Sequence, residues 1–485
     1  MKRVQIYFTI LVLIALTAVS CKKEFLEIDP KQNTDASKAI TDIAGLRAAV
    51  TGVYSLLQSA DNYGRTSTLL PDLMADNLYI SVLNANRYQP QDQYVTSAND
   101  GMATGLWNNL YTVVANTNLV IEKGPGITAA AADTAEKRRL VGQAYALRAL
   151  AYFDLARFFA QPYNFTADAS HLGVPVLTTT STDKSNIAAP ARNTVKQTYD
   201  QIINDLNSAI NNLSTYTSTS STAKGKFNLY GAQSLLSRVY LYKGDWQGAA
   251  DMASAVISAN KYTLLPRATF VDDFKKQYNS ESIFEVANTT TDNLSTNSIG
   301  YFFNQSGYGD ALATDGLYNS YSSTDVRKGF MTRSKRSGSG GENPANIVNK
   351  YSNVSTFDEN LKVIRLAELY LNRAEANAHL GKEDLARTDV NTIIARSNSD
   401  ATALVPLTTI GSALLTAILN ERRKELAFEG HRLFDLTRNK LSFTKIRRGG
   451  TAIEVTYPNN KTILPIPQRE LDANTNIRGQ QNPGY

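Results

Sequence analysis

The sequence predicts a mainly α-helical protein, with a scaffold of stacked antiparallel helix pairs and a second, loop-rich subdomain. Three observations lead to this prediction. Long segments repeat apolar residues with the 3.6-residue period of a helix, and almost all carry alanine and leucine on one face. Two helix pairs share one spacing of glycine and alanine. Residues 262–360 have few helical periods and many Asn, Ser, Thr and Gly, which indicates a part with a different structure.

The first element is an export signal. Lys2 and Arg3 precede an apolar run over residues 4–16, and small residues at 17–20 lead to Cys21, the only cysteine among 485 residues. The apolar run is too short to span a bilayer by itself. We therefore predict a signal peptide at residues 1–20 and a mature chain of 465 residues, with 48 basic and 44 acidic side chains and a formal charge of +4.

Cys21 is the predicted lipidation site. A cysteine at the first mature position supplies the thiol that carries the diacylglyceryl group of a bacterial lipoprotein. Several acyl chains, at about 0.8 kcal/mol per buried methylene, hold a protein firmly at a membrane. Residues 21–39 are then a lipidated N-terminal tether. The alternative is ordinary cleavage after Ala18-Val19-Ser20, which leaves Cys21 as a free thiol near the terminus.

The segments that follow have helical periodicity and are separated by Ser/Thr-rich connectors, whose composition cannot bury a core. The predicted helices are residues 40–58, 105–122, 134–160, 193–213, 228–242, 246–259, 361–380, 383–397 and 411–429.

Two helix pairs, one before and one after the loop-rich segment, follow one rule. Gly244 stands five residues before Ala249, and Gly381 stands five residues before Ala386. Small residues let two helices approach closely, a left-handed glycine ends the first helix, and Trp246 wedges one turn. This pattern is tetratricopeptide-like. A third, degenerate pair is expected at residues 138–160 and 195–213.

Composition excludes several kinds of site. A single cysteine allows neither a disulfide within the chain nor a thiolate metal site. The three histidines, His171, His379 and His431, are isolated from one another, so no zinc-site spacing and no Ser/His/Asp arrangement is present. Basic residues alternate with acidic ones, which argues against a nucleic-acid partner. We expect no metal, no cofactor and no nucleic acid, and we interpret the histidines as structural.

Several longer motifs occur in a fixed order along the chain. They are DLMADN at 72–77, WNNLYTVVANTN at 107–118, AYALRALAYFDLARFF at 144–159 with GVPV at 173–176, SRVYLYKGDW at 237–246, IRLAELYLNRAEA at 364–376, ERRKELAFEGHRLFDLTR at 421–438, and LPIP at 464–467 with QNPGY at 481–485. Through these motifs the chain, from Cys21 to Tyr485, resembles the SusD/RagB family of outer-membrane nutrient-uptake lipoproteins of Bacteroidetes-type bacteria.

The resemblance implies a SusD-like α-solenoid and a division of the chain. It places the two parts of the helical scaffold at residues 40–261 and 361–485, with the loop-rich aromatic subdomain at 262–360 between them. It also implies a lipid-anchored protein of the outer membrane, exposed on the cell surface, that captures an oligosaccharide. The implied partner is a SusC-like TonB-dependent transporter, to which the ligand is delivered. No catalysis is attached to this fold.

Two charged motifs are interpreted as structural and not catalytic. Glu421, Glu425 and Glu429 stand four residues apart on one predicted helical face, as a charge ladder that is solvated or paired with neighbouring arginines. Asp154 and Arg157 form an i,i+3 pair that we expect to lock helices together. Neither motif then serves as a pair of carboxylates for acid/base chemistry.

Two tyrosine-rich zones in polar sequence are predicted to form the ligand site. Residues 301–321 hold six aromatics, where the chain average of 9% predicts about two. Exposed aromatic faces stack on the C–H patches of sugars, and amide side chains bond their hydroxyls. The predicted rings are Tyr79, Tyr88 and Tyr94 from one zone and Tyr301, Phe303 and Tyr308 from the other, with Asn62, Asn77, Gln91 and Asn304 as polar partners. Trp107 and Trp246 are assigned to the scaffold.

Three other functions remain open at this point. Tyrosine-rich loops serve a peptide as well as a glycan, so a RagB-like peptide-uptake receptor is the first alternative. A surface glycosidase lipoprotein is the second, and it needs two carboxylates about 5–10 Å apart; the candidates in the loop-rich zones are Asp76, Asp310 and Asp315. A protein-interaction scaffold is the third, because tetratricopeptide pairs alone would permit it.

Overall fold

The computed structural model describes residue 5 and residues 40–180, 189–400 and 406–485. The predicted signal peptide cleavage, the tether and Cys21 lie outside the described residues. No helix in the described part of the chain is both long and apolar enough to cross a bilayer.

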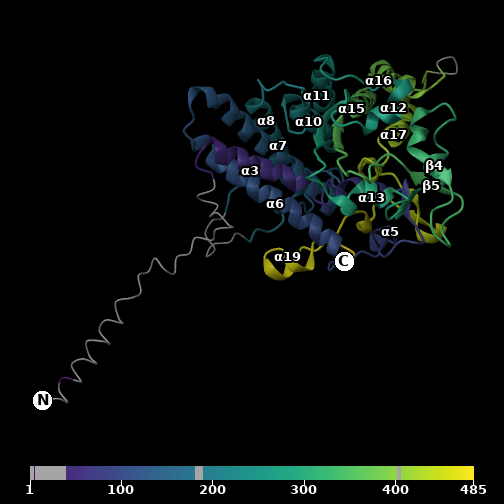
Figure 1. Ribbon diagram of the computed structural model, residues 1–485, viewed down its shortest axis with the longest axis horizontal. Helices are drawn as coiled ribbons and strands as arrows, with labels where there is room; N and C mark the ends of the chain where they lie inside the picture. Colours follow the sequence, from purple (N-terminus) through teal and green to yellow (C-terminus); the bar gives the residue numbers. More distant parts are fainter. Residues whose placement is uncertain (1–4, 6–39, 181–188, 401–405) are drawn as a thin grey trace.

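The scaffold is a row of long helices that pack in sequence order, from α3 and α6 at one end to α16 and α17 at the other (Figure 1). This confirms the predicted mainly α-helical class. The scaffold helices are α3 (Ile43–Leu57), α6 (Gly101–Lys123), α7 (Thr134–Phe159), α8 (Val195–Asn212), α10 (Leu229–Lys243), α11 (Trp246–Ser258), α15 (Leu366–His379), α16 (Glu383–Ser397) and α17 (Gly411–Glu425).

Shorter helices lie between these elements or against them. They are α4 (Thr66–Leu73), α5 (Gln89–Asp92), α9 (Ser221–Lys224), α12 (Phe270–Lys275), α13 (Ile299–Phe303), α14 (Asp315–Tyr318), α18 (Arg432–Arg438) and α19 (Gln468–Ala473). The 3₁₀ turns are η2 (Gly124–Gly126), η3 (Ala131–Asp133), η4 (Arg267–Thr269), η5 (Ser295–Asn297), η6 (Val326–Phe330), η7 (Arg448–Gly450) and η8 (Asn460–Thr462).

The two predicted helix pairs form as antiparallel hairpins. Gly244 ends α10 with a φ of 81°, and Gly381, between α15 and α16, has a φ of 72°. Both are in the left-handed region that glycine enters without a steric cost. Trp246 lies flat on His379 with ring centroids 3.8 Å apart, so the turn of the first pair contacts the end of α15. This ring contact joins the two pairs to each other.

The third predicted pair also packs together. Within the core, α7 lies against α8, and Arg148 on α7 reaches both carboxylate oxygens of Asp205 on α8, at 2.8 and 2.6 Å. On the same helix Arg157 pairs with Asp154, whose other oxygen accepts a hydrogen bond from the Tyr63 hydroxyl at 2.8 Å. The Arg157 guanidinium also lies over the rings of Tyr242 on α10 and Phe434 on α18, 5.8 and 4.6 Å from their centres, which confirms that the pair locks helices together.

The predicted helix at 361–380 is wrong at its start. Residues Leu361–Arg365 form β6, which pairs antiparallel with β2 (Ser282–Val286), and α15 begins only at Leu366. The apolar residues of this segment keep the 3.6-residue spacing of the helix that follows, but the segment pairs with a distant strand, and this tertiary contact outweighs the local helical preference. The predicted helix at 411–429 ends early as well, because α17 stops at Glu425 and Phe428 has a φ of 67°.

A small antiparallel sheet joins the two tyrosine-rich zones. Its strand order is β1-β3-β5-β4, where the strands are β1 (Leu78–Ile80), β3 (Ala311–Ala313), β5 (Ala345–Val348) and β4 (Met331–Ser334). Tyr79 pairs with Leu312, so a segment close to the chain start adds the edge strand to the sheet of the loop-rich segment. A separate hairpin is formed by β7 (Phe443–Ile446) and β8 (Ala452–Val455).

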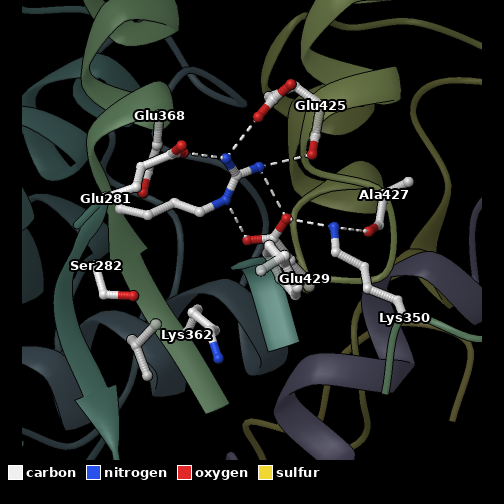
Figure 2. A network of polar contacts seen from close by, with 12 residues as sticks. Glu281, Ser282, Lys350, Lys362, Glu368, Glu425, Ala427 and Glu429 are labelled. Carbon is white, nitrogen blue, oxygen red and sulfur yellow. Dashed lines mark hydrogen bonds and ion pairs between the residues drawn. The ribbon is translucent and has the colours of Figure 1, made fainter. Parts of the chain in front are cut away.

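A buried ion network ties the loop-rich segment to the scaffold, and Figure 2 shows Glu281, Glu425 and Glu429 converging on one guanidinium. This group belongs to Arg365, which donates to Glu281 at 2.6 Å, to Glu425 at 2.5 Å and to both oxygens of Glu429 at 2.7 and 2.9 Å. Lys350 adds a bond to Glu429 at 2.6 Å. Since these side chains are almost fully buried, removing one partner would leave an uncompensated charge.

The network also settles the role of the predicted glutamate ladder. Glu421 and Glu425 are 2% and 1% exposed, so the alternative of a solvated ladder is wrong. Glu421 and Glu425 both bond Arg327, which comes from the loop-rich segment, at 2.7 and 2.9 Å. Burial alone would raise the pKa of Glu425, but the charges of nearby arginines hold it well below its ordinary range. The ladder is therefore structural, and its partners come from distant elements.

Candidate functional site

Two half-exposed rings of the second tyrosine zone lie at the end of α13. Ser298 caps this helix by accepting a hydrogen bond from the Tyr301 N–H at 3.3 Å. The helix buries Phe302 and Phe303 and leaves Tyr301 half-exposed. Tyr308 follows on the next turn, and the two tyrosine rings meet edge to face with centroids 4.8 Å apart. The pair presents an aromatic surface with hydroxyl groups to solvent, which is the chemistry that a sugar or a peptide would use.

Arg87 covers one side of this pair. Its guanidinium carbon lies 3.6 Å from the centre of the Tyr308 ring, and its Nε donates to Asp310 Oδ2 at 2.6 Å. The Asp310 side chain is 2% exposed, whereas that of Arg87 is 33% exposed. Burial raises the pKa of Asp310, and the bond and charge of Arg87 oppose this rise. We call Arg87, Tyr301, Tyr308 and Asp310 the ring cluster.

The loop of the ring cluster is held by close backbone contacts. A Cβ on Gly307 would lie 2.4 Å from the Tyr301 carbonyl oxygen and 2.9 Å from its Cγ, so only glycine lets the turn close over Tyr301. The Tyr308 N–H donates to the same carbonyl at 2.9 Å. Arg336 donates from Nη2 to the Tyr308 carbonyl at 2.7 Å. The two rings are thus preorganised before any ligand arrives.

Two tyrosines of the first zone, Tyr88 and Tyr94, use their hydroxyl groups in hydrogen bonds within the protein. Tyr88 is 8% exposed, and its hydroxyl bonds Arg65 Nε at 3.0 Å and Thr66 Oγ1 at 2.7 Å. Tyr94 is half-buried and donates its hydroxyl hydrogen bond to the Met74 carbonyl. Burial raises the pKa of Tyr94 above its ordinary range. In this conformation both rings have structural partners, and their roles as ligand contacts stay predictions.

Several other predicted contacts are buried. Asn62 donates to Asn109 Oδ1 at 2.9 Å, and Asn77 donates to Asp72 Oδ1 at 2.7 Å. Gln91 is 1% exposed, and its Nε2 bonds no other atom in the described part of the chain. The predicted contacts that have less than a tenth of their surface exposed are Asn62, Asn77, Tyr88, Gln91 and Phe303.

The two remaining predicted residues lie at different places. Asn304 is on the ring-cluster turn, where its Oδ1 accepts from the Ser306 N–H at 2.7 Å. Tyr79 is half-exposed on β1, and burial raises its pKa to about 12. The structure therefore brings Tyr301, Asn304 and Tyr308 together and leaves Tyr79 on the wall of a separate cavity.

Sequence reasoning missed Arg87 and Phe357. The Phe357 ring lies 6.0 Å from the Tyr301 ring and extends the aromatic surface. Phe357 stands alone in a Ser/Thr/Asn-rich loop, and nothing in its neighbourhood singles it out. Arg87 directly precedes Tyr88 within the first zone, and this position next to a predicted ligand-binding tyrosine could have marked Arg87 as a candidate.

Two of the hollows on the described surface have the volume of a small-ligand pocket. One, of about 540 Å³, is lined by Trp107, Tyr111, Pro175, Pro190 and Glu470 among others. Trp107 itself is 2% exposed and packs its ring on Phe159, which confirms its assignment to the scaffold. The other has about 710 Å³, and we call it the arginine cavity. Its principal lining residues are Asp76, Tyr79, Asp315, Asn346, Arg423, Arg432, Leu441, Phe443 and Thr444.

The two carboxylates of the arginine cavity, Asp76 and Asp315, are poorly suited to acid catalysis. A glycosidase needs one carboxyl group that keeps its proton near neutral pH beside one that is ionised. Burial would raise the pKa of Asp76, but bonds and charge from Arg432 and Arg423 lower it. Hydrogen bonds from Asn346 and Arg333 lower the pKa of Asp315. Both carboxylates of the arginine cavity are thus held ionised.

Two family models of the SusD type together match most of the chain. The model of the SusD family matches residues 214–485, and a second model, described as starch-binding associating with outer membrane, matches residues 24–241. A curated relative, SusD-like protein P2 of Formosa agariphila, is 25% identical over an alignment of 539 positions that covers 100% of both chains.

Solved structures share the fold along most of the chain. A SusD superfamily protein of Bacteroides vulgatus is 28% identical, with a TM-score of 0.81, and the match covers 92% of this chain and 100% of that one. Surface glycan-binding protein A of Bacteroides thetaiotaomicron, solved in complex with laminarihexaose, is 20% identical with a TM-score of 0.72, and the match covers 90% of this chain and 99% of that one. The second likeness is one of fold alone.

Proposed function

The chain belongs to the SusD family, and on this premise we propose that it is an outer-membrane receptor that binds an oligosaccharide without altering it. The ring cluster is the proposed binding surface, with Tyr301 and Tyr308 against the C–H faces of the sugar. Arg87 and Asn304 supply polar groups for its hydroxyls. Lipid anchoring at Cys21, exposure on the cell surface and delivery to a SusC-like TonB-dependent transporter complete the proposal.

The observation that carries this proposal is the half-exposed, preorganised ring pair of Tyr301 and Tyr308. In the same segment, the neighbouring Phe302 and Phe303 are fully buried, whereas Tyr301 and Tyr308 each keep part of their surface exposed to solvent. The two half-exposed rings give an apolar contact surface, and the arginine beside them supplies N–H groups that can donate hydrogen bonds to a ligand. The description of the model that matches residues 24–241, starch-binding associating with outer membrane, supports both the ligand class and the location.

A glycan array followed by calorimetry tests the proposal. The array identifies the oligosaccharide, and isothermal titration then compares the unaltered protein with Tyr301→Ala and Tyr308→Ala. We expect each substitution to weaken binding by about tenfold or more, because a central aromatic anchor is lost. Tyr145→Ala is the matched control, since Tyr145 is a half-buried tyrosine on α7, away from the ring cluster. Unchanged affinity in both test variants would contradict the proposed site.

Two rival functions give different results in the same assays. A peptide-uptake receptor would bind short peptides and leave the glycan array blank. A glycosidase would shorten the array hits during incubation, which thin-layer chromatography detects. We propose that the protein neither binds short peptides nor cleaves glycans. The lowered pKa values of Asp76 and Asp315 support the expectation that glycans are not cleaved. Delivery is tested by co-purification of the lipidated protein with a transporter from outer membranes.

A further inference from the structure

The arginine cavity has an excess of positive charge on its inner wall. Arg432 donates from Nε and Nη2 to the two oxygens of Asp76, at 2.7 and 3.0 Å. Arg423 also contacts this carboxylate, with Nη2 at 3.1 Å from Oδ2. One carboxylate therefore faces two guanidinium groups. Such a site favours a second anion because the remaining charge is not compensated.

Donor groups for a further anion are present on both arginines. Arg423 uses Nε for Asn77 Oδ1 at 2.8 Å and Nη2 for the Asp76 carbonyl at 2.9 Å. The Nη1 groups of Arg423 and Arg432 make no hydrogen bond to any described residue. The two side chains are 15% and 10% exposed, and both line the cavity. Planar guanidinium groups bind carboxylates with directed, charge-assisted hydrogen bonds.

Two further carboxylates lie near the arginines: Asp72 is buried, accepts hydrogen bonds from Asn77 and from the Phe428 and Gly430 N–H groups, and does not line the cavity. The second, Asp315, lines the cavity, but it is 67% exposed and is paired with Arg333 at 2.7 Å. Burial lowers the pKa of Arg423, and the nearby charge of Arg432 adds to the effect. An anion bound between the two guanidinium groups would offset both the burial of the Arg423 charge and its repulsion from Arg432.

The other walls suit a sugar ring. Tyr79 offers a half-exposed aromatic ring to the cavity, and Leu441, which is 41% exposed, adds an apolar side chain to its lining. Ser442, just before β7, and Thr444 on this strand also line the cavity; the Ser442 hydroxyl accepts a hydrogen bond from the Tyr457 N–H at 3.0 Å, and the Thr444 hydroxyl donates one to Glu454 at 2.5 Å. The volume of about 710 Å³ is typical of small-ligand pockets. The cavity thus combines an anion site, an apolar face and hydroxyls.

We infer that the arginine cavity is a second binding site, which takes the carboxylate of an acidic sugar such as a hexuronate between Arg423 and Arg432. The inference rests on the proposed function as a carbohydrate receptor and adds a ligand class to it. The cavity lies at the other end of β3 from the ring cluster, since Asp310 precedes this strand and Asp315 follows it. Its three residues separate the two sites by about 10 Å along the strand.

Calorimetry with D-glucuronate tests the inference, with D-glucose and methyl glucuronate as neutral probes. We expect glucuronate to bind, the neutral probes to bind at least about tenfold more weakly, and the affinity to fall as salt is added. Arg423→Gln and Arg432→Gln should each weaken glucuronate binding by about 10- to 100-fold. Equal binding of glucose, or inorganic sulfate binding as tightly as glucuronate, would overturn the assignment.

A second set of variants covers the case in which an arginine variant fails to fold. Thr444→Trp adds a large ring to the cavity lining at an exposed position on β7 and keeps both arginines, and it should abolish glucuronate binding. Tyr308→Ala alters only the ring cluster and should leave glucuronate binding unchanged. If Thr444→Trp has no effect, or if Tyr308→Ala removes glucuronate binding, the cavity is not the site. If the unaltered protein bound glucuronate but no neutral glycan, the ring cluster would not be the proposed binding surface, whereas the assignment of the arginine cavity would still hold.

Discussion

The guanidinium of Arg87 lies over the Tyr308 ring, with its central carbon 3.6 Å from the ring centre, and its Nε donates to Asp310 Oδ2 at 2.6 Å. Arg87 and Asp310 are 223 residues apart in the sequence, so their contact joins the two tyrosine-rich zones. The arginine fixes one ring of the exposed pair and keeps donor groups available at its rim. The ring cluster is therefore a composite of two distant segments.

Arg87→Ala should weaken binding of the oligosaccharide identified on the array by about tenfold, because a charged hydrogen-bond donor is lost and the Tyr308 ring loses its support. Titration calorimetry measures the change. Tyr308→Phe is the control that keeps the ring, and it should retain most of the affinity. An increase in affinity for Arg87→Ala would mean that the arginine blocks the ring face, contrary to this account.

Gly307→Ala should weaken ligand binding, because a Cβ at this position would lie 2.4 Å from the Tyr301 carbonyl oxygen and the turn must open. Gly52→Ala is the matched control. Gly52 is an exposed residue within α3 with no atom within 4 Å of its added Cβ, so this change should stabilise the protein by about 0.5–1 kcal/mol and leave binding unaltered. Calorimetry and urea denaturation give the two readouts, and equal affinities for both variants would refute the constraint.

Arg365→Gln should lower the free energy of unfolding by about 3–5 kcal/mol, because Glu281, Glu425 and Glu429 would remain buried without their shared cation. Urea denaturation measures this loss. Lys196→Ala removes the solvent-exposed partner of Asp200 and should cause no measurable change. A loss below about 1 kcal/mol for Arg365→Gln would show that the network contributes no more than a surface pair.

Asp72 should make stability depend on pH in a specific window. It is fully buried and accepts hydrogen bonds from Asn77 Nδ2 at 2.7 Å and from the Phe428 and Gly430 N–H groups at 3.0 and 3.1 Å. Burial raises its pKa from 3.8 to about 6. Between these values the folded protein keeps a proton that the unfolded chain has released.

The free energy of unfolding should therefore fall as the pH rises from about 4 to about 6, by about 3 kcal/mol from this residue. Below pH 4 both states hold the proton, and above pH 6 neither does. Denaturation curves at several pH values measure the slope, and the difference between the unaltered protein and Asp72→Asn isolates the contribution of Asp72. Parallel pH profiles for the two proteins would contradict the raised pKa.

The long helices and their pairing follow from local patterns. The α10–α11 hairpin matches its predicted segments closely, and the α15–α16 hairpin matches from Leu366 onward, since apolar periodicity, Gly244 and Gly381 act over a few neighbouring residues. The strand Leu361–Arg365 escaped prediction because its partner β2 lies about 80 residues earlier in the chain. Its apolar residues fit a helical period equally well.

The candidate site divides in the same way. Tyr301 and Tyr308 come together on one short turn, and their shared polar sequence was enough to select them. Tyr88 stands in similar sequence, yet its ring packs on Phe302 with centroids 5.4 Å apart. Exposure is a property of a side chain and of everything that covers it, so neighbouring residues alone cannot reveal it.

From the order of its residues alone, this chain specifies its helical class, its paired hairpins and the segment that displays aromatic rings, because each depends on spacing over a few positions. Only the folded molecule decides which rings face solvent, that Arg87 supports Tyr308, and that Arg423 and Arg432 share Asp76 in a cavity. Those outcomes depend on contacts between segments hundreds of residues apart, whose burial and charge pairing are set by packing.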